Sequence, residues 1–209
     1  MNYKIKVGSE AESKEAQGLF YGVGFRGGKH KGYDGNNQKN EYRLWMNVLK
    51  RCYSKWFSEN RPSYNGCFMS DNFKSYDYFY EWCNNQIGFI GDNFALDKDL
   101  LIKGNRVYSE NTCVFLPRDI NNALILRKSK RGRFPIGVSF SDRDNRFRAV
   151  LTMFGENVCV GYFKDVESAF NKYKEVKELY LKSLAEMYKG NIDNRAYDAL
   201  VNYEVSIND

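Results

Sequence analysis

Hydrophobic residues in the first half of the chain recur at the three- and four-residue spacing of an amphipathic helix. In residues 41–57 this stripe consists of Trp45, Val48, Leu49, Cys52 and Trp56. Asn40 precedes the stripe and is expected to cap the helix. A second helix is predicted from Ser75, as its N-cap, to about Asn85. Before residue 41 the mixture of glycine and aromatic residues at 19–38 predicts a short hairpin.

Short apolar segments separated by turn residues predict strands in the middle of the chain. "GCFMS" at 66–70 predicts a short strand, "FALDKDLL" at 94–101 a second and "CVFLP" at 113–117 a third. A helix is expected to follow Pro117 over residues 118–126. The order strand, loop, strand, helix is therefore predicted for this region.

Strict alternation replaces the helical spacing after residue 133. "IGVSFS", "RFRAVLTM" and "NVCVGYF" predict a three-stranded antiparallel meander. Asp165 is expected to cap a long helix over about 166–188, whose apolar stripe packs on one face of the sheet. This stripe consists of Ala169, Phe170, Tyr173, Val176, Tyr180 and Leu184. A helical turn is predicted around 195–202, and the fold class is α+β.

The sharpest change of composition lies at "RKSKRGR", residues 127–133, where five of seven residues are basic. We predict a domain boundary there, with one domain at 1–126, a basic linker at 127–133 and a second domain with its tail at 134–209.

Charge and cysteine content narrow the partners and the compartment. The chain of 209 residues has 32 Lys+Arg against 26 Asp+Glu, a formal net charge of +6. This favours a polyanionic partner, although a soluble protein with scattered lysines explains the same excess. No window approaches the roughly 18 apolar residues of a membrane span, so no membrane partner and a cytoplasmic location are expected.

The five cysteines contain no C-x-x-C pair, which predicts buried thiols rather than a zinc knuckle or a disulfide framework.

The C-terminal segment resembles the APETALA2-type DNA-binding domain of plants in its phage form. The resemblance covers roughly residues 134–180 and depends on Gly137-Val138, Phe147-Arg148-Ala149, Val160-Gly161-Tyr162-Phe163 and Ser168-Ala169. It implies that the outer sheet face enters the major groove of double-stranded DNA. Strand alternation independently places polar residues on this face and in its first turn. The expected DNA-binding residues are Ser139, Ser141, Arg143, Arg146, Arg148, Thr152 and Asn157, together with Arg127, Lys128, Lys130, Arg131 and Arg133 of the linker.

The remainder of the chain resembles HNH-type homing endonucleases of bacteriophages that carry this same second domain. The matching segments are "EYRLWMNVLKRCY" (41–53), "GCFMSDNFKSYDYFYEW" (66–82) and, most specifically, "LDKDLLIKGNRVYSENTCVFLPRDIN" (96–121). The resemblance implies a phage-encoded DNA endonuclease whose N-terminal domain holds a degenerate ββα unit with flanking helices. In the second domain it implies a sheet packed on one long helix.

The residues that such a site needs are only partly present. The general-base histidine of the family falls on Lys98, and Thr112 stands where an asparagine is common. His30, the one histidine of the chain, could act only if its loop folded over the site; the alternative is an exposed and inert side chain.

Two carboxylates remain as candidates for metal binding. Asp97 and Asp99 would share one face of an extended strand over 96–100, with Lys98 on the other face. Together with Asn121 they could hold Mg²⁺ or another divalent cation. The alternative is that the carboxylates pair with Lys103, Arg106 or Arg118.

These features leave two hypotheses for function. The first is a DNA-binding protein related to HNH homing endonucleases, with weak metal-dependent cleavage through Asp97, Asp99 and His30. The second is a catalytically inactive relative that acts as a counter-defence inhibitor or regulator by binding DNA or a host defence protein. A small-molecule site is weaker, because "GVGFRGG" at 22–28 lacks the helix that a phosphate-cradling loop requires.

Overall fold

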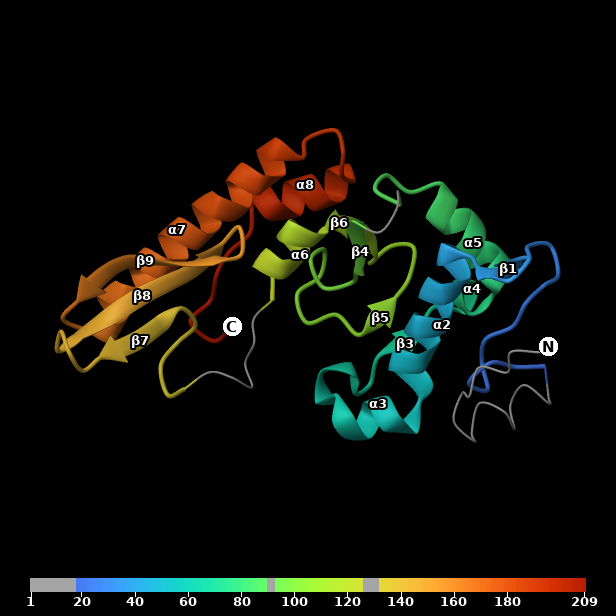
Figure 1. The fold of residues 1–209 in the computed structure, drawn as a ribbon, viewed down its shortest axis with the longest axis horizontal. Coiled ribbons are helices and arrows are strands. Elements are labelled where there is room, and N and C mark those ends of the chain that lie inside the picture. Colours follow the sequence, from blue (N-terminus) through green and yellow to red (C-terminus); the bar gives the residue numbers. More distant parts are fainter. Residues whose placement is uncertain (1–17, 90–92, 126–131) are drawn as a thin grey trace. The chain divides into compact units, whose positions relative to one another are not determined.

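The computed structural model describes residues 18–89, 93–125 and 132–209, and their fold is α+β with several small sheets, as the sequence predicts (Figure 1). Contacts among these residues gather into two compact units. The first unit comprises 18–89 and 101–113, and the second comprises 93–100, 114–125 and 132–209. No helix in these described ranges is long and apolar enough to cross a membrane.

The first unit is built from short helices and two-residue strands. In chain order its elements are β1 (Tyr33–Asp34), β2 (Asn37–Gln38), α2 (Asn40–Tyr53), α3 (Lys55–Asn60), the 3-10 helix η1 (Pro62–Tyr64), β3 (Phe68–Met69), α4 (Asp71–Lys74), α5 (Tyr76–Asn84) and β5 (Val107–Tyr108). β1 pairs with β2 in the expected hairpin, and β3 runs parallel to β5.

Local capping explains where these helices begin. The Ser54 side chain accepts the backbone N–H of Phe57 at 3.2 Å, and this starts a new helix. The single helix expected over 41–57 is therefore wrong: it is divided into α2 and α3. Asn40 is the first residue of α2, so its expected capping role is also wrong. Ser75 caps α5 as predicted, because its side chain accepts the N–H of Tyr78.

Aromatic side chains make up much of the core of the first unit. Trp45 and Tyr76 are fully buried, with ring centroids 5.5 Å apart, and Phe73 lies in the same core. The indole N–H of Trp45 donates to the backbone oxygen of Phe73 at 2.9 Å, so the one polar atom of this ring is satisfied.

The second unit contains a ββα segment and the larger sheet. Its elements are β4 (Phe94–Asp97), β6 (Val114–Pro117), α6 (Arg118–Ala123), β7 (Val138–Ser141), β8 (Arg146–Met153), β9 (Glu156–Phe163), α7 (Val166–Met187) and α8 (Asn194–Val201). β4 pairs antiparallel with β6, and α6 follows directly, which is the predicted strand order. The strand expected at 94–101 ends earlier, at Asp97.

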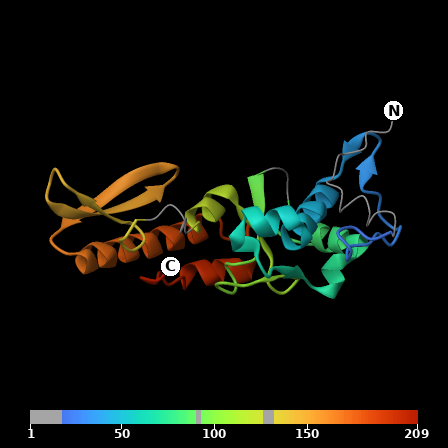
Figure 2. The same cartoon turned by 90° about the horizontal axis from the view of Figure 1, so that it is seen from below.

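The predicted meander and its covering helix are both present. β7, β8 and β9 form an antiparallel sheet in that order, and α7 packs along one of its faces (Figures 1 and 2). Asp165 caps α7 by accepting the N–H of Ser168 at 2.7 Å. Phe170 and Tyr173 of α7 are 5% and 4% exposed, so they are part of the core beneath the sheet.

Gly137, just before β7, lies against the Tyr173 ring of α7. Its φ of +74° belongs to the left-handed region, and a Cβ at this position would overlap the ring of Tyr173. Its carbonyl oxygen accepts the N–H of Val150 at 2.7 Å, which fixes the backbone to β8.

Helix α6 packs against α7 in this unit. The Lys177 ammonium group donates to the carbonyl oxygen of Ala123 at the end of α6, and the Tyr188 hydroxyl donates to Asp119 at 2.8 Å. Residues 114–125 therefore group with the C-terminal residues, which differs from the division expected at 127–133. Residues 126–131 lie outside the described residues.

Candidate functional site

The outer face of the β7–β8–β9 sheet carries the expected polar residues. Arg148 lies at the centre, opposite Ser139 on β7, and its Nε donates to the Ser139 hydroxyl at 3.3 Å. Thr152 lies opposite Asn157 on β9, and its hydroxyl donates to the Asn157 amide oxygen at 2.8 Å. These pairs confirm the alternation predicted for β7 and β8.

A register shift in β9 adds a residue that the alternation rule misses. Ala149 pairs with Gly161, whereas the next residue, Val150, pairs with Cys159, so Val160 is the extra residue of a β-bulge. The extra residue reverses the inward and outward alternation of the β9 residues that follow it. Tyr162 consequently lies opposite Arg148 on the outer face and is 46% exposed.

The prediction of five buried cysteines is only partly correct, because Cys52 is half-buried and Cys159 shares the outer face with Asn157 by ordinary strand alternation. Cys67, Cys83 and Cys113 are buried as expected, but Cys159 is exposed on the outer face opposite Val150. Gly161 was the available sequence signal for the bulge, because an isolated glycine within a strand pattern often marks one.

The turn between β7 and β8 holds two of the expected DNA-binding residues near a carboxylate. Ser141 donates to Asp144 at 2.6 Å, and the Arg143 guanidinium lies 3.3 Å from the other Asp144 oxygen. The Ser141 hydrogen bond and then the Arg143 contact keep the pKa of Asp144 below its usual value. The Arg143 side chain is 85% exposed, so this ion pair is solvated and weak. Arg146, opposite Ser141, is exposed as well.

Most of the basic linker cannot be placed on this surface. Arg127, Lys128, Lys130 and Arg131 lie outside the described residues. Arg133 is described, and its guanidinium carbon lies 4.9 Å from the centre of the Phe134 ring. Phe134 in turn contacts Phe147 at 5.4 Å between centroids, so Arg133 stacks on the aromatic cluster at the base of the sheet.

The two candidate metal ligands already have protein partners. Oδ1 of Asp97 accepts the backbone N–H groups of Asp99 (2.9 Å) and Leu100 (2.7 Å). The chain bends immediately after β4, so the expectation of an extended strand over 96–100 is wrong. Burial raises the pKa of Asp97 above its ordinary value, against the opposing effect of the two N–H donors.

Lys98, which the sequence resemblance aligned with a general-base histidine, lies beside the second carboxylate. Its Nζ is 2.6 Å from Oδ1 of Asp99, and its side chain is only 8% exposed. The bend therefore removes the opposite-face arrangement expected for Lys98 and Asp99. A buried ammonium group here supplies the positive charge that a cation would otherwise bring to Asp99.

These contacts fit a divalent ion poorly. A hard cation needs six or more oxygen ligands, whereas Asp97 is occupied by backbone donors and Asp99 by Lys98. Asn121 lies in α6 of the same unit, and among the described residues no hydrogen bond joins its side chain to either carboxylate. Within those ranges there is also no group of three or more His, Cys, Asp or Glu side chains arranged for a metal ion.

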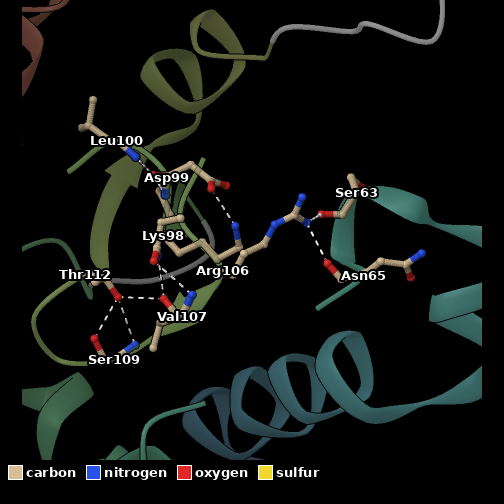
Figure 3. Close-up of polar contacts among 11 residues, drawn as sticks. Ser63, Asn65, Lys98, Asp99, Leu100, Arg106, Val107, Ser109 and Thr112 are labelled. Atoms are coloured by element: carbon tan, nitrogen blue, oxygen red, sulfur yellow. Dashed lines mark hydrogen bonds and ion pairs between the residues drawn. The ribbon is translucent and has the colours of Figure 1, made fainter. Parts of the chain in front are cut away.

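Thr112, which the sequence resemblance aligned with an asparagine, closes a loop in the first unit. Its hydroxyl donates to the Val107 backbone oxygen at 2.7 Å (Figure 3). The same hydroxyl oxygen lies 2.9 Å from the Ser109 hydroxyl and accepts the backbone N–H of Ser109. Thr112 is 8% exposed, so its side chain is committed to this loop.

His30 is held against helix α5 of the first unit. Its ring stacks on Tyr80 with centroids 4.0 Å apart, and Nε2 lies 3.3 Å from Oε1 of Glu81. The backbone N–H groups of Lys29 and His30 both donate to the Asp77 carboxylate, at 3.0 and 2.9 Å. The loop is thus fixed to α5 by its backbone, and the imidazole has a carboxylate beside it. A catalytic role for His30 stays a prediction.

Comparison of the chain with family models, with curated proteins and with solved structures finds no match.

Proposed function

We propose that this chain is a DNA-binding protein related to the HNH homing endonucleases of phages, and that it holds double-stranded DNA on the outer face of the β7–β8–β9 sheet. The observation that carries the proposal is the centre of this face, where Arg148 lies between Ser139 and Tyr162. A guanidinium group flanked by a hydroxyl and a phenol offers donors to phosphate or base edges and an apolar ring to the sugar.

Electrostatics support the same partner. The basic residues of this face and its first turn, Arg143, Arg146 and Arg148, belong to a chain with a net charge of +6. Each phosphate that they neutralise releases counterions, so binding should weaken steeply with salt concentration.

The test is fluorescence anisotropy with a labelled duplex at several salt concentrations. Arg148→Ala should weaken binding to different sequences by similar factors and lower the salt slope by about one. Lys172→Ala is the matched control, because Lys172 lies on α7 and its charge is paired with Glu175 at 3.0 Å. Equal losses in both variants, or binding that does not change with salt, would contradict the proposal.

The ββα segment favours the second hypothesis, in which cleavage has been lost. The Lys98 ammonium group on Asp99 and the backbone donors on Asp97 already occupy Oδ1 of each carboxylate, which disfavours a cation there. Purified protein should therefore leave supercoiled plasmid intact with Mg²⁺ or Mn²⁺, as should the double variant Asp97→Ala, Asp99→Ala. Metal-dependent nicking that the double variant abolishes would restore the nuclease hypothesis, and its loss in His30→Ala would assign the imidazole to catalysis.

A further inference from the structure

We propose that an aromatic surface on helix α3 of the first unit binds single-stranded DNA by stacking unpaired bases on Trp56. Three neighbouring side chains form this surface, here called the aromatic row: Trp56, Phe57 and Tyr64. Trp56 is 53% exposed, and α3 has no buried residue. Phe57 is half-buried and the other residues of α3 are exposed, so packing of the core does not explain the tryptophan on this helix.

The aromatic row is continuous. The centroids of Trp56 and Phe57 are 5.1 Å apart, and those of Phe57 and Tyr64 are 5.6 Å apart, both pairs meeting edge to face. Edge-to-face neighbours support one another while leaving the outer ring faces open. An open indole face is the surface on which an unpaired base stacks, whatever its identity.

Basic side chains lie beside the aromatic row. The Lys50 ammonium lies 5.8 Å from the centre of the Phe57 ring, and the Arg51 guanidinium lies 5.5 Å from that of Tyr64. Lys55 and Arg61, at the two ends of α3, are both exposed.

Arg106 adds a fifth basic residue from another part of the first unit. Its guanidinium donates to the backbone oxygens of Ser63 (3.0 Å) and Asn65 (2.8 Å), so it holds the η1 segment that carries Tyr64 (Figure 3). Arg106 itself is exposed.

The charge of the surface around the aromatic row favours a negatively charged ligand. Five basic residues face one acidic residue in this region, Glu59, which is 3.9 Å from Lys55. A strand of phosphates can track these cations while its bases stack on the row. In a duplex the bases are already stacked on one another, so the row cannot reach their faces. The surface belongs to the first unit, and the proposal does not depend on the sheet face of the second.

The tryptophans provide the test. The chain has three, and Trp45 and Trp82 are 0% and 8% exposed, so Trp56 is the tryptophan that reports contact with solvent or a base. Oligodeoxythymidylate of about 10 nucleotides, a length suited to such sites, should quench its fluorescence. Added salt should reverse the quenching.

Variants of the full chain separate the contributions. By anisotropy of the labelled oligonucleotide, Trp56→Ala should weaken binding roughly tenfold, whereas Trp56→Phe keeps a ring and should lose less. Phe68→Ala is the matched control, because Phe68 is an aromatic residue with 48% exposure outside the row. Arg148→Ala should leave this binding unchanged, which distinguishes the row from the sheet face. Unchanged binding in Trp56→Ala, or an equal loss with duplex DNA of the same length, would overturn the proposal.

Discussion

The close approach of Gly137 to Tyr173 predicts that one added methyl group destabilises the second unit. In Gly137→Ala the backbone must keep a φ of +74°, which costs an L-residue about 1–2 kcal/mol. The new Cβ also overlaps three ring carbons of Tyr173, a side chain with only 4% exposure. Displacing a packed ring typically adds about 1–3 kcal/mol. The backbone cannot move away freely, because the Gly137 oxygen accepts the Val150 N–H.

Gly155→Ala isolates the backbone contribution. Gly155 has a φ of +86°, and nothing lies within 4 Å of a Cβ built there. Its substitution should therefore cost about 1–2 kcal/mol, whereas Gly137→Ala should cost about 2–5 kcal/mol. The difference between the two variants measures the displacement of the Tyr173 ring.

The assay is urea unfolding followed by circular dichroism. A double-mutant cycle completes it, since Tyr173→Ala should be less destabilising in the Gly137→Ala background than in the wild-type chain. Equal destabilisation by Gly137→Ala and Gly155→Ala, or a cycle with no coupling, would refute the steric argument.

Three further substitutions probe the core. Phe170→Ala removes a ring with 5% exposure and should lower the free energy of unfolding by about 3–5 kcal/mol in the same assay. Thr112→Val should cost about 1–3 kcal/mol, because the buried N–H of Ser109 loses its acceptor; a neutral Thr112→Val would mean that water replaces the hydroxyl. Burial lowers the pKa of Lys177 from 10.5 to about 8. Between pH 8 and pH 10.5 Lys177 is protonated in the unfolded chain and mostly neutral in the folded chain. The stability of the wild type relative to Lys177→Met should therefore rise with pH over this range, by about 3 kcal/mol in total. A difference in the free energy of unfolding between the wild type and Lys177→Met that does not change with pH would contradict this pKa shift.

Periodicity predicted the elements that depend on local pattern. The meander, its long helix, the caps Ser75 and Asp165 and the final helix all follow from residues close together in the sequence. The break at Ser54 was missed, although a serine before Lys55 is an ordinary N-cap. The hydrophobic stripe continues across it, and the stripe alone suggested one helix.

The candidate sites were harder to predict because they depend on departures from regular geometry. Strand alternation placed Arg148 and Thr152 on the outer sheet face, but the bulge at Val160 brought Tyr162 there as well. The bend after Asp97 turned Lys98 toward Asp99, and a rule for extended chain cannot anticipate this. The division of the chain was equally non-local, since residues 70–106 separate β3 from β5 along the chain.

The placement of 101–113 in the first unit has a consequence for the order of folding. On a ribosome β4 is made before the first unit is complete, because β3 must wait for β5 to pair with it. β4 can pair only after β6 has been made, and β6 follows residues 101–113 in the chain. The first unit can therefore close only once β5 has left the exit tunnel, and a chain truncated before Val107 would leave both β3 and β4 without a strand partner. The stability of the first unit in the nascent chain should rise when β5 pairs with β3 rather than with each completed helix.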